Sequence, residues 1–162
     1  MSISVRRATT KDAALIATLI ADVQELHAAA LPRYFKPVDK VCYAEDAAEV
    51  LAKPERLVFI ACVGDEPAGF VHAEMIYQPE TSLICEQHTL YIHAISVRPN
   101  YRRRGVGSAL MAAVRGAGQS LRIEGLVLDV WIFNEAARQF FRRHGLVASC
   151  ERYVTASDLG AA

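Results

Sequence analysis

Hydrophobic and polar positions in the first part of the chain predict a short strand, two helices and then two more strands. Apolar residues recur at helical spacing from Leu15 to Leu26, which predicts a helix over about 11–29 with Thr10 as its N-cap. Residues 38–53, which end just before Pro54, predict a second helix. Short apolar runs predict a first strand at Ile3–Arg7 and an antiparallel hairpin made of Leu57–Val63 and Ala68–Tyr77.

The rest of the chain alternates strands with helices. Residues 90–97 are apolar and β-rich, and they predict a strand. Helical spacing begins at Val106 and continues to about residue 120. The remaining predicted elements are a strand at Gly125–Phe133, a helix at Asn134–His144 with Gly145 as its C-cap glycine, and a strand at Val147–Thr155. This order predicts one α/β domain over residues 1–162.

The apolar phase changes within the central strand. Leu90, Ile92 and Ala94 share one face under regular alternation, but the apolar positions then move to Ile95 and Val97. A phase change in a strand indicates a β-bulge. A strand that is buried on both faces would give the same pattern without a bulge.

A basic, glycine-containing loop joins this strand to the next helix. Arg102, Arg103 and Arg104 run directly into Gly105-Val106-Gly107. A helix start has unpaired N–H groups and partial positive charge, and arginine adds forked donors. The loop therefore predicts a site for phosphate or pyrophosphate. It lacks the Gly-Lys-Ser/Thr of a Walker A loop and the spacing of a dinucleotide-binding fingerprint.

Two segments resemble the GNAT superfamily of acyl-CoA N-acyltransferases. Residues 102–107, which follow Val97-Arg98-Pro99, match the signature Gln/Arg-x-x-Gly-x-Gly/Ala. Residues 134–146 are similar to the segment Asn-x-x-Ala-x-x-x-Tyr-x-x-x-Gly-Phe of that family. The resemblance implies an α/β fold of the α+β type, with a mixed, mainly antiparallel sheet of about six to seven strands and four flanking helices. It also favours the bulge.

The resemblance implies transfer of an acetyl group from acetyl-CoA to a primary amine by direct attack on the thioester, with no metal. Backbone groups of Ile95, Ser96 and Val97 would hold the acetyl carbonyl and the pantetheine arm. Asn134 would contact that arm, although an N-cap role explains this asparagine equally well. The pyrophosphate would be held by residues of the loop and helix start, namely Arg102, Arg103, Arg104, Gly105, Val106, Gly107 and Ser108.

The position of the general acid departs from the family pattern. Phe141 stands where the family often has Tyr, and Phe has no proton to donate. Tyr153 or Tyr101 would replace it, or the thiolate would leave unassisted. Phe141 itself is then interpreted as a wall of the cofactor channel.

The general base is predicted to be His93. It resembles a histidine of the His-x-His-Ala arrangement in arylalkylamine acetyltransferases, with Tyr91 at the first position. Histidine ordinarily titrates near neutral pH, which suits a base. A buried, hydrogen-bonded structural histidine is the alternative. Glu74 and His72 share one face of the neighbouring strand, where either would act through a water; a solvent-facing strand surface is the interpretation we prefer for them.

Composition narrows the class of protein. The 18 basic and 18 acidic residues give a net charge of zero, which argues against nucleic acid or an anionic membrane as a partner. Four widely spaced cysteines without a C-x-x-C pair predict free, mostly buried thiols in a reducing cytoplasm. We also expect no apolar signal core and no segment near the length of a membrane span.

Other functions and partners stay open at this point. Phe141 favours an acetyl-CoA-binding sensor module with little catalysis, and a shallow groove would favour a protein N-terminal or lysine acetyltransferase. The acceptor is a small-molecule amine or a peptide amine, and the loops at 34–36 and 78–88 would line its site. A homodimer is expected, because homodimers are common among the proteins that the chain resembles.

Overall fold

The computed structural model describes residues 2–155 of the predicted domain. Within this range the chain forms one five-stranded sheet, four α-helices and two 3-10 turns. The elements are β1 (Ile3–Arg7), a 3-10 turn (Thr10–Asp12), α1 (Ala13–Ala30), α2 (Lys40–Ala52), β2 (Arg56–Val63), β3 (Glu66–Gln78), β4 (Gln87–Val97), a 3-10 turn (Pro99–Tyr101), α3 (Val106–Leu121), β5 (Gly125–Leu128) and α4 (Glu135–Arg143).

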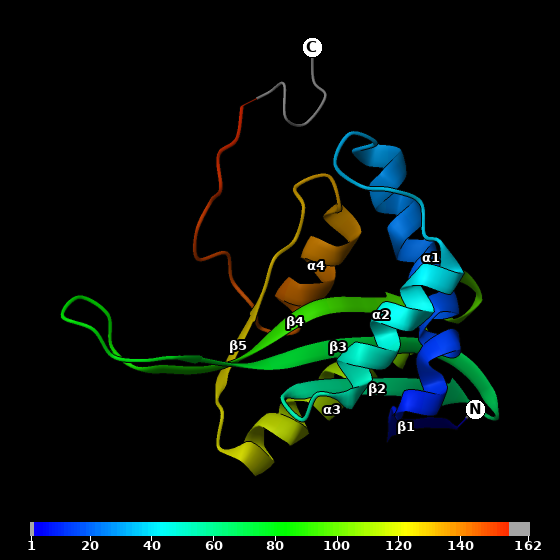
Figure 1. Ribbon diagram of the computed structural model, residues 1–162, viewed down its shortest axis with the longest axis horizontal. Helices are drawn as coiled ribbons and strands as arrows, with labels where there is room; N and C mark the ends of the chain where they lie inside the picture. Colours follow the sequence, from blue (N-terminus) through cyan, green and yellow to red (C-terminus); the bar gives the residue numbers. More distant parts are fainter. Residues whose placement is uncertain (1, 156–162) are drawn as a thin grey trace.

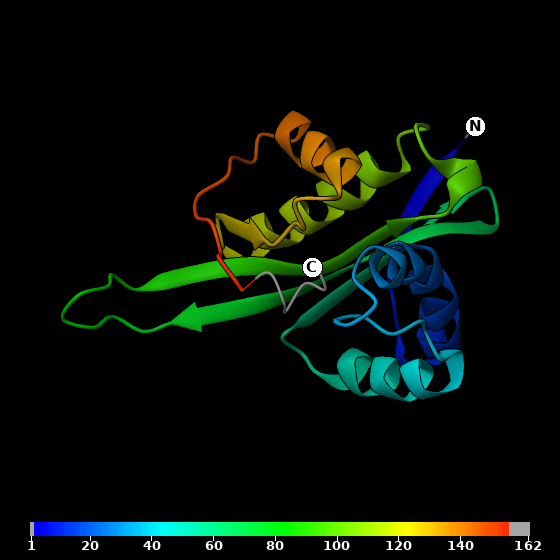
Figure 2. The ribbon, with the colours of Figure 1, turned by 90° about the horizontal axis from the view of Figure 1, so that it is seen from above.

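The sheet lies between two layers of helices. Helices α1 and α2 cover one face, and α3 and α4 cover the other (Figure 2). The strand order is β1-β2-β3-β4-β5, with antiparallel pairing from β1 to β4 and parallel pairing between β4 and β5. Because both faces are covered, β2 is a continuous apolar run: Leu57 packs on the α3 side and Val58 on the α1 side.

The strand count corrects the sequence prediction. Residues 147–155 form no strand, and β5 ends at Leu128 rather than at Phe133, so the described residues contain five strands instead of six to seven. A strand exists only where a neighbouring strand completes its hydrogen-bond ladder, and among residues 2–155 no strand pairs with residues 147–154. The mainly antiparallel character and the four helices are confirmed.

The start of the first helix also differs. The predicted helix begins at Ala13, because Thr10–Asp12 adopt a 3-10 turn. Asp12 holds this turn: its carboxylate accepts the N–H of Thr9 at 2.8 Å and pairs with Arg6 at 2.6 Å. Thr10 is therefore not the N-cap of the α-helix; that position is Asp12.

Two expectations from composition need correction. Cys42, Cys85 and Cys150 are exposed and Cys62 is half-buried, so the free thiols are mostly at the surface. The segment Thr10–Ala30 is long and apolar enough to cross a membrane by length and composition, with a mean hydropathy of 1.3. Its buried side chains pack against the sheet, and the core helix of a globular domain passes the same test.

Strands β3 and β4 extend past the rest of the sheet as a two-stranded arm (Figure 1). The ladder with β2 ends at Glu74 and the ladder with β5 begins at Thr89, so residues 75–78 of β3 pair with residues 87–90 of β4 and have no ladder partner in β2. The arm begins where Glu74 lies, and the polar residues described below gather at its base.

Candidate active site

A β-bulge interrupts β4 at His93. His72 of β3 faces Ala94 and Ala73 faces Ile92, which leaves His93 without a partner in the ladder. Ile92 and Ile95 pack on the α3 side, whereas Ala94 packs on the α1 side. Of the two interpretations of the phase change, the structure has the bulge, which the family resemblance favoured, and Ala94 lies on the opposite face from Leu90 and Ile92. It turns the His93 side chain toward polar groups of β3 on the α1 side of the sheet.

The side chains of Glu74, His93 and Arg56 form one ionic cluster. The Glu74 carboxylate oxygen Oε2 lies 2.6 Å from His93 Nε2 and 2.7 Å from Arg56 Nη1. His93 Nε2 also lies 2.9 Å from Arg56 Nη1. A carboxylate only accepts and a guanidinium only donates, so Nε2 cannot hydrogen-bond to both groups. We assign the Nε2 proton to the shorter contact with Glu74, and Arg56 Nη1 then donates to the carboxylate. His93 Nδ1 is then left with a lone pair. The side chain of Glu74 is 16% exposed, which corrects its interpretation as a solvent-facing residue.

His72 closes the inner side of this cluster. Its ring stacks on that of His93 with centroids 4.8 Å apart, and Arg56 Nη1 lies 3.4 Å from its Nε2. Burial, assisted by the positive charge of His93 and Arg56, lowers the pKa of His72 to about 4. His72 is therefore neutral at physiological pH and packs as an uncharged ring.

Replacing His72 by Gln should flatten the dependence of stability on pH. The folded pKa lies below the ordinary value of 6.5, so between pH 6.5 and about 4 the unfolded chain binds a proton that the native chain does not. The free energy of unfolding of the wild type should thus fall as the pH is lowered through this window, by up to about 1.4 kcal/mol per pH unit from this group. Urea unfolding of both proteins at a series of pH values measures the difference. Parallel curves would contradict the assignment.

Tyr91 and Asp129 extend the polar cluster toward β5. The Tyr91 ring lies edge-on to His93 at 4.8 Å, and its hydroxyl donates to Asp129 Oδ2 at 2.9 Å. Burial and this hydrogen bond raise the pKa of Tyr91, and the positive charge of Arg152 opposes the shift. A carboxylate, a phenol and an imidazole thus lie in one row beside the bulge.

Strands β4 and β5 separate at the bulge. Their ladder runs from Thr89 with Gly125 to Ile92 with Leu128, and β4 then continues to Val97 paired with β3 but not with β5. Residues 94–97 therefore have a β4 edge without a strand partner on the β5 side. This edge contains Ile95, Ser96 and Val97, the predicted contacts of the acetyl carbonyl and the pantetheine arm, and Ser96 is buried.

The basic loop follows the end of this edge. Arg102 Nε donates to the Val97 carbonyl at 3.0 Å, so this side chain ties the loop to β4. Arg103 has a φ of 60° and Gly105, the N-cap of α3, a φ of 86°. No side chain caps the helix start, and all three arginines are exposed. The first N–H groups of α3 and the fixed positive charge thus favour an anion at this point.

Gly107 and Ser108 turn toward α4. A Cβ built on Gly107 would lie 3.0 Å from the Phe140 ring, so the glycine permits close packing of α4 on the start of α3. Ser108 Oγ lies 3.2 Å from His144 Nε2. Gly107 and the side chain of Ser108 therefore contribute to the packing of α4 on α3. The backbone N–H groups of Gly107 and Ser108 belong to the first turn of α3.

We expect Gly107→Val to destabilise the fold by about 1–3 kcal/mol, because the added side chain must displace Phe140. Gly116→Val is the matched control, since it lies in the same helix and a Cβ there meets nothing within 4 Å. The control should stay within about 0.5 kcal/mol of the wild type. Urea unfolding of the three proteins tests this, and an equal effect of both substitutions would refute the packing role.

The other predicted residues lie in three different settings. Asn134 Oδ1 accepts the N–H of Ala137 at 3.1 Å, which confirms its N-cap role; its contact with the pantetheine arm stays a prediction. Phe141 is 7% exposed and packs within the core under α3, so its place in the channel wall also stays a prediction.

Tyr153 is 86% exposed and donates to Glu151, and Tyr101 packs against the core. The structure brings neither tyrosine to the Glu74–His93 pair.

The sequence interpretation missed Arg56 and Asp129. Arg56 was placed just outside the strand that it starts, and a charged residue next to a buried run was the available signal. Asp129 lay inside the predicted strand Gly125–Phe133, where a single carboxylate interrupts apolar residues. Only the pairing of Arg56 with Glu74 across β2 and β3 shows that these groups meet.

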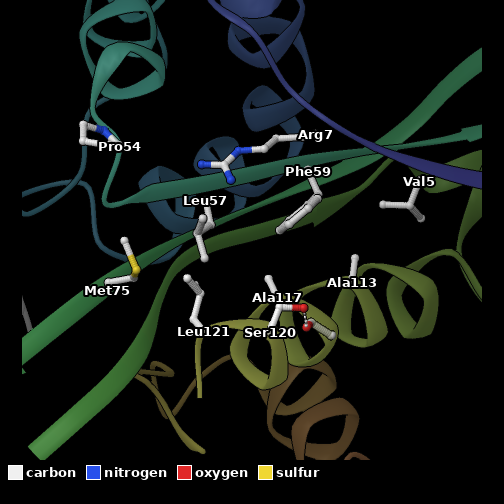
Figure 3. A pocket seen from close by; sticks show the side chains of 11 residues that line it. Val5, Arg7, Pro54, Leu57, Phe59, Met75, Ala113, Ala117, Ser120 and Leu121 are labelled. Atoms are coloured by element: carbon white, nitrogen blue, oxygen red, sulfur yellow. Dashed lines mark hydrogen bonds between the residues drawn. The ribbon is translucent and has the colours of Figure 1, made fainter. Parts of the chain in front are cut away.

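The opposite side of the sheet has a pocket of about 440 Å³ between β1–β3 and the C-terminal half of α3 (Figure 3). Its walls are mostly apolar, including Leu57, Phe59 and Met75, with Arg7 at the rim. Leu57 belongs to the α3-side core, whereas Glu74 and His93 face the α1 side. We therefore place the candidate chemistry at the bulge and not in this pocket. Among residues 2–155, no group of three or more His, Cys, Asp or Glu is arranged to hold a metal ion.

The family model described as Acetyltransferase (GNAT) family matches residues 21–146. The match covers most of the chain and includes the bulge, the basic loop and α4. The chain therefore belongs to the GNAT family of acetyltransferases, as its sequence motifs predicted. A search of curated protein sequences found no significant match.

Solved structures confirm the fold. A tetramutant of the BH1408 protein from Bacillus halodurans has a TM-score of 0.89 at 20% identity, over 94% of this chain and 98% of that one. AAC(6')-Iy in complex with the bisubstrate analog CoA-S-monomethyl-acetylneamine has a TM-score of 0.75 at 19% identity, over 96% and 97%. A structure of the aminoglycoside N-acetyltransferase AAC(6')-Iy in complex with CoA has a TM-score of 0.75 at 19% identity, over 95% of this chain and 93% of that one.

Proposed function

We propose that this protein transfers the acetyl group of acetyl-CoA to the primary amine of a small molecule. The observation that carries the proposal is the Glu74–His93 pair at the bulge where β4 stops pairing with β5. The basic loop and the start of α3 follow directly after β4. Two solved relatives of the fold contain CoA or a CoA analog, which supports acetyl-CoA as the cosubstrate.

The residues present suit acetyl-CoA. The exposed Arg103 and Arg104 and the uncapped N–H groups of α3 offer positive charge and donors for the pyrophosphate. The free edge at Ile95–Val97 offers backbone donors and acceptors for an extended pantetheine arm and for the carbonyl oxygen of the acetyl group. Bound there, acetyl-CoA supplies a thioester carbon close to the bulge.

His93 would remove the first proton from the acceptor. An ammonium group cannot attack, so it first gives a proton to the lone pair on His93 Nδ1, while Glu74 stabilises the imidazolium through Nε2–H. The amine nitrogen then bonds to the acetyl carbon and the carbon–sulfur bond breaks. The second amine proton passes to the departing thiolate, so the products are the acetamide, CoA and one proton left on His93 for release to solvent.

Arg56 acts as a positioning residue in this scheme. Its guanidinium holds the Glu74 carboxylate that orients His93, and its own side chain is only 19% exposed. Neither Tyr101 nor Tyr153 reaches the pair, and Phe141 cannot donate a proton. Tyr91 lies beside His93, but its hydroxyl donates to Asp129. The thiolate therefore takes its proton from the amine or from water in our proposal. Because Phe141 cannot act as a general acid, a second candidate function is an acetyl-CoA sensor with little turnover.

Thermal unfolding with and without acetyl-CoA tests cofactor use directly. A ligand at about 100 times its dissociation constant that binds only the native state should add roughly 2.7 kcal/mol. We expect a clear rise in Tm with acetyl-CoA and none with ATP. Release of CoA thiol in the presence of an amine then separates the enzyme from the sensor. Absence of a Tm shift would refute the cofactor assignment.

A further inference from the structure

The pocket between β1–β3 and the C-terminal half of α3 takes no part in the proposed acetyl transfer. Its volume of about 440 Å³ lies within the range of about 300–1,000 Å³ that is typical of ligand pockets. The pocket and the ionic cluster share two strands, because Leu57 follows Arg56 on β2 and Met75 follows Glu74 on β3. Successive side chains of a strand point to opposite faces, so an occupant of the pocket would lie behind the cluster without touching it.

The pocket exists because α3 changes the size of its sheet-facing side chains along its length. In the first half of the helix, Val106, Leu110 and Met111 fill the core. In the second half, the residues that line the pocket are mostly small, namely Ala113, Gly116, Ala117 and Ser120 (Figure 3). A Cβ built on Gly116 meets nothing within 4 Å. The helix therefore leaves apolar space above β2.

The sheet side of the pocket presents apolar side chains that are incompletely covered. Leu57 is buried, whereas Phe59 and Met75 remain half-buried although they lie on strands under a helix. Protein interiors are normally close-packed, and apolar surface left in contact with water forgoes the free energy of burial. An apolar ligand that covers these side chains would gain that free energy.

Arg7 supplies the charge at the rim and is the one charged residue among the 11 that line the pocket. Its Nη2 donates to the carbonyl of Arg56 at 3.0 Å, which holds the guanidinium in place. The neighbouring Arg6 is paired with Asp12, but within residues 2–155 no carboxylate forms an ion pair with Arg7. Because a guanidinium has five N–H donors, the exposed Arg7 keeps donors available for an anion.

The walls and the arginine together define the chemistry of a ligand. The apolar walls select an alkyl or aromatic group, and a guanidinium binds a carboxylate through two parallel charge-assisted hydrogen bonds. A cationic head group would meet only the positive charge of Arg7, since no acidic residue lines the pocket. A phosphate would bring about two negative charges to a single arginine. A monocarboxylate is therefore the head group that fits.

We propose that this pocket binds a small monocarboxylate with an apolar chain. The carboxylate pairs with Arg7 at the rim, and the chain lies between β2 and the small residues of α3. The site is separate from the basic loop and from the bulge, so its ligand is neither acetyl-CoA nor the acceptor. Its existence does not depend on the proposed function.

Titration of the full chain with octanoate, followed by amide NMR spectra, tests both the affinity and the location. Saturable shifts are expected for backbone amides around residues 5–7, 57–59 and 113–121. Excess CoA should leave the affinity for octanoate unchanged. Octanol and octylammonium have the same chain without the carboxylate, and each should bind at least about tenfold more weakly. Competition by CoA would assign octanoate to the basic loop and overturn the proposal, as would equal affinity for octylammonium.

Two substitutions separate the head-group contact from the chain contact. Arg7→Gln should weaken octanoate binding by about tenfold and leave octanol binding unchanged. Ala117→Leu fills the pocket and should abolish binding of both ligands. Ala112→Leu is the matched control, because Ala112 is an exposed residue of the same helix outside the pocket. This control should bind octanoate as the wild type does, and the Tm of each variant checks that it folds.

Unchanged octanoate affinity in Arg7→Gln, or undiminished binding by a folded Ala117→Leu, overturns the proposal. Sedimentation equilibrium of the wild type covers the remaining occupant, a second copy of the chain. A dimer that shows no saturable octanoate binding, and that Ala117→Leu but not Ala112→Leu dissociates, would assign this face to the second copy. That result, or an absence of saturable binding by a monomer, also overturns the proposal.

Discussion

Glu74→Gln is expected to lower kcat for acetyl transfer by about 100-fold or more, the usual scale for loss of a general-base system. The amide of Gln cannot stabilise an imidazolium as a carboxylate does, so the Nε2–H contact with His93 loses its charge. The KM for acetyl-CoA should not change, because Glu74 lies on β3 away from the basic loop. Steady-state kinetics with saturating amine and varied acetyl-CoA measure both quantities.

Glu66→Gln is the matched control for this prediction, because it makes the same change at an exposed position of the same strand. It should leave kcat unchanged. The base itself is tested by His93→Ala, which should lower kcat by about 100-fold or more and leave the KM for acetyl-CoA unchanged, because the proton acceptor is lost. An unchanged kcat would exclude His93 as the base.

Charge reversal of the loop is the second large expected effect. Arg103→Glu combined with Arg104→Glu should weaken acetyl-CoA binding by about 100-fold, or roughly 2.7 kcal/mol. The two exposed guanidinium groups stand beside the uncapped start of α3, and carboxylates there would repel a pyrophosphate. Isothermal titration at several salt concentrations should show a weaker salt dependence for the variant.

The combination of Lys40→Glu and Lys53→Glu gives the same change in net charge on α2 and at its C-cap, away from the loop. This control should bind acetyl-CoA as the wild type does. Equal affinity of the loop variant and the wild type would remove the pyrophosphate assignment. Equal weakening by both pairs would show that net charge, and not the loop, attracts the cofactor.

Local sequence patterns predicted those features of the fold that depend on a single helix, strand or loop. The phase change around Ala94 marked the place where the family resemblance favoured a bulge, which lies at His93, and the glycine loop before Val106 predicted the helix start. Both are read from neighbouring residues, because strand alternation and helix capping depend on local backbone geometry. The predicted last strand at 147–155 failed for the opposite reason, since its existence depends on a partner strand elsewhere.

The sequence by itself determined the family and the basic loop, because each is encoded in a short run of residues. For the bulge it left two interpretations open, and the family resemblance favoured the correct one. Only the tertiary structure decided which side chains meet there. Register between β2, β3 and β4 brings Arg56, Glu74 and His93 within hydrogen-bond distance, and the α1–α2 loop brings Tyr34 to Trp131. These residues are up to 97 positions apart in the chain, from Tyr34 to Trp131, and no local pattern specifies such contacts. They depend on how the sheet pairs and on which face each helix covers.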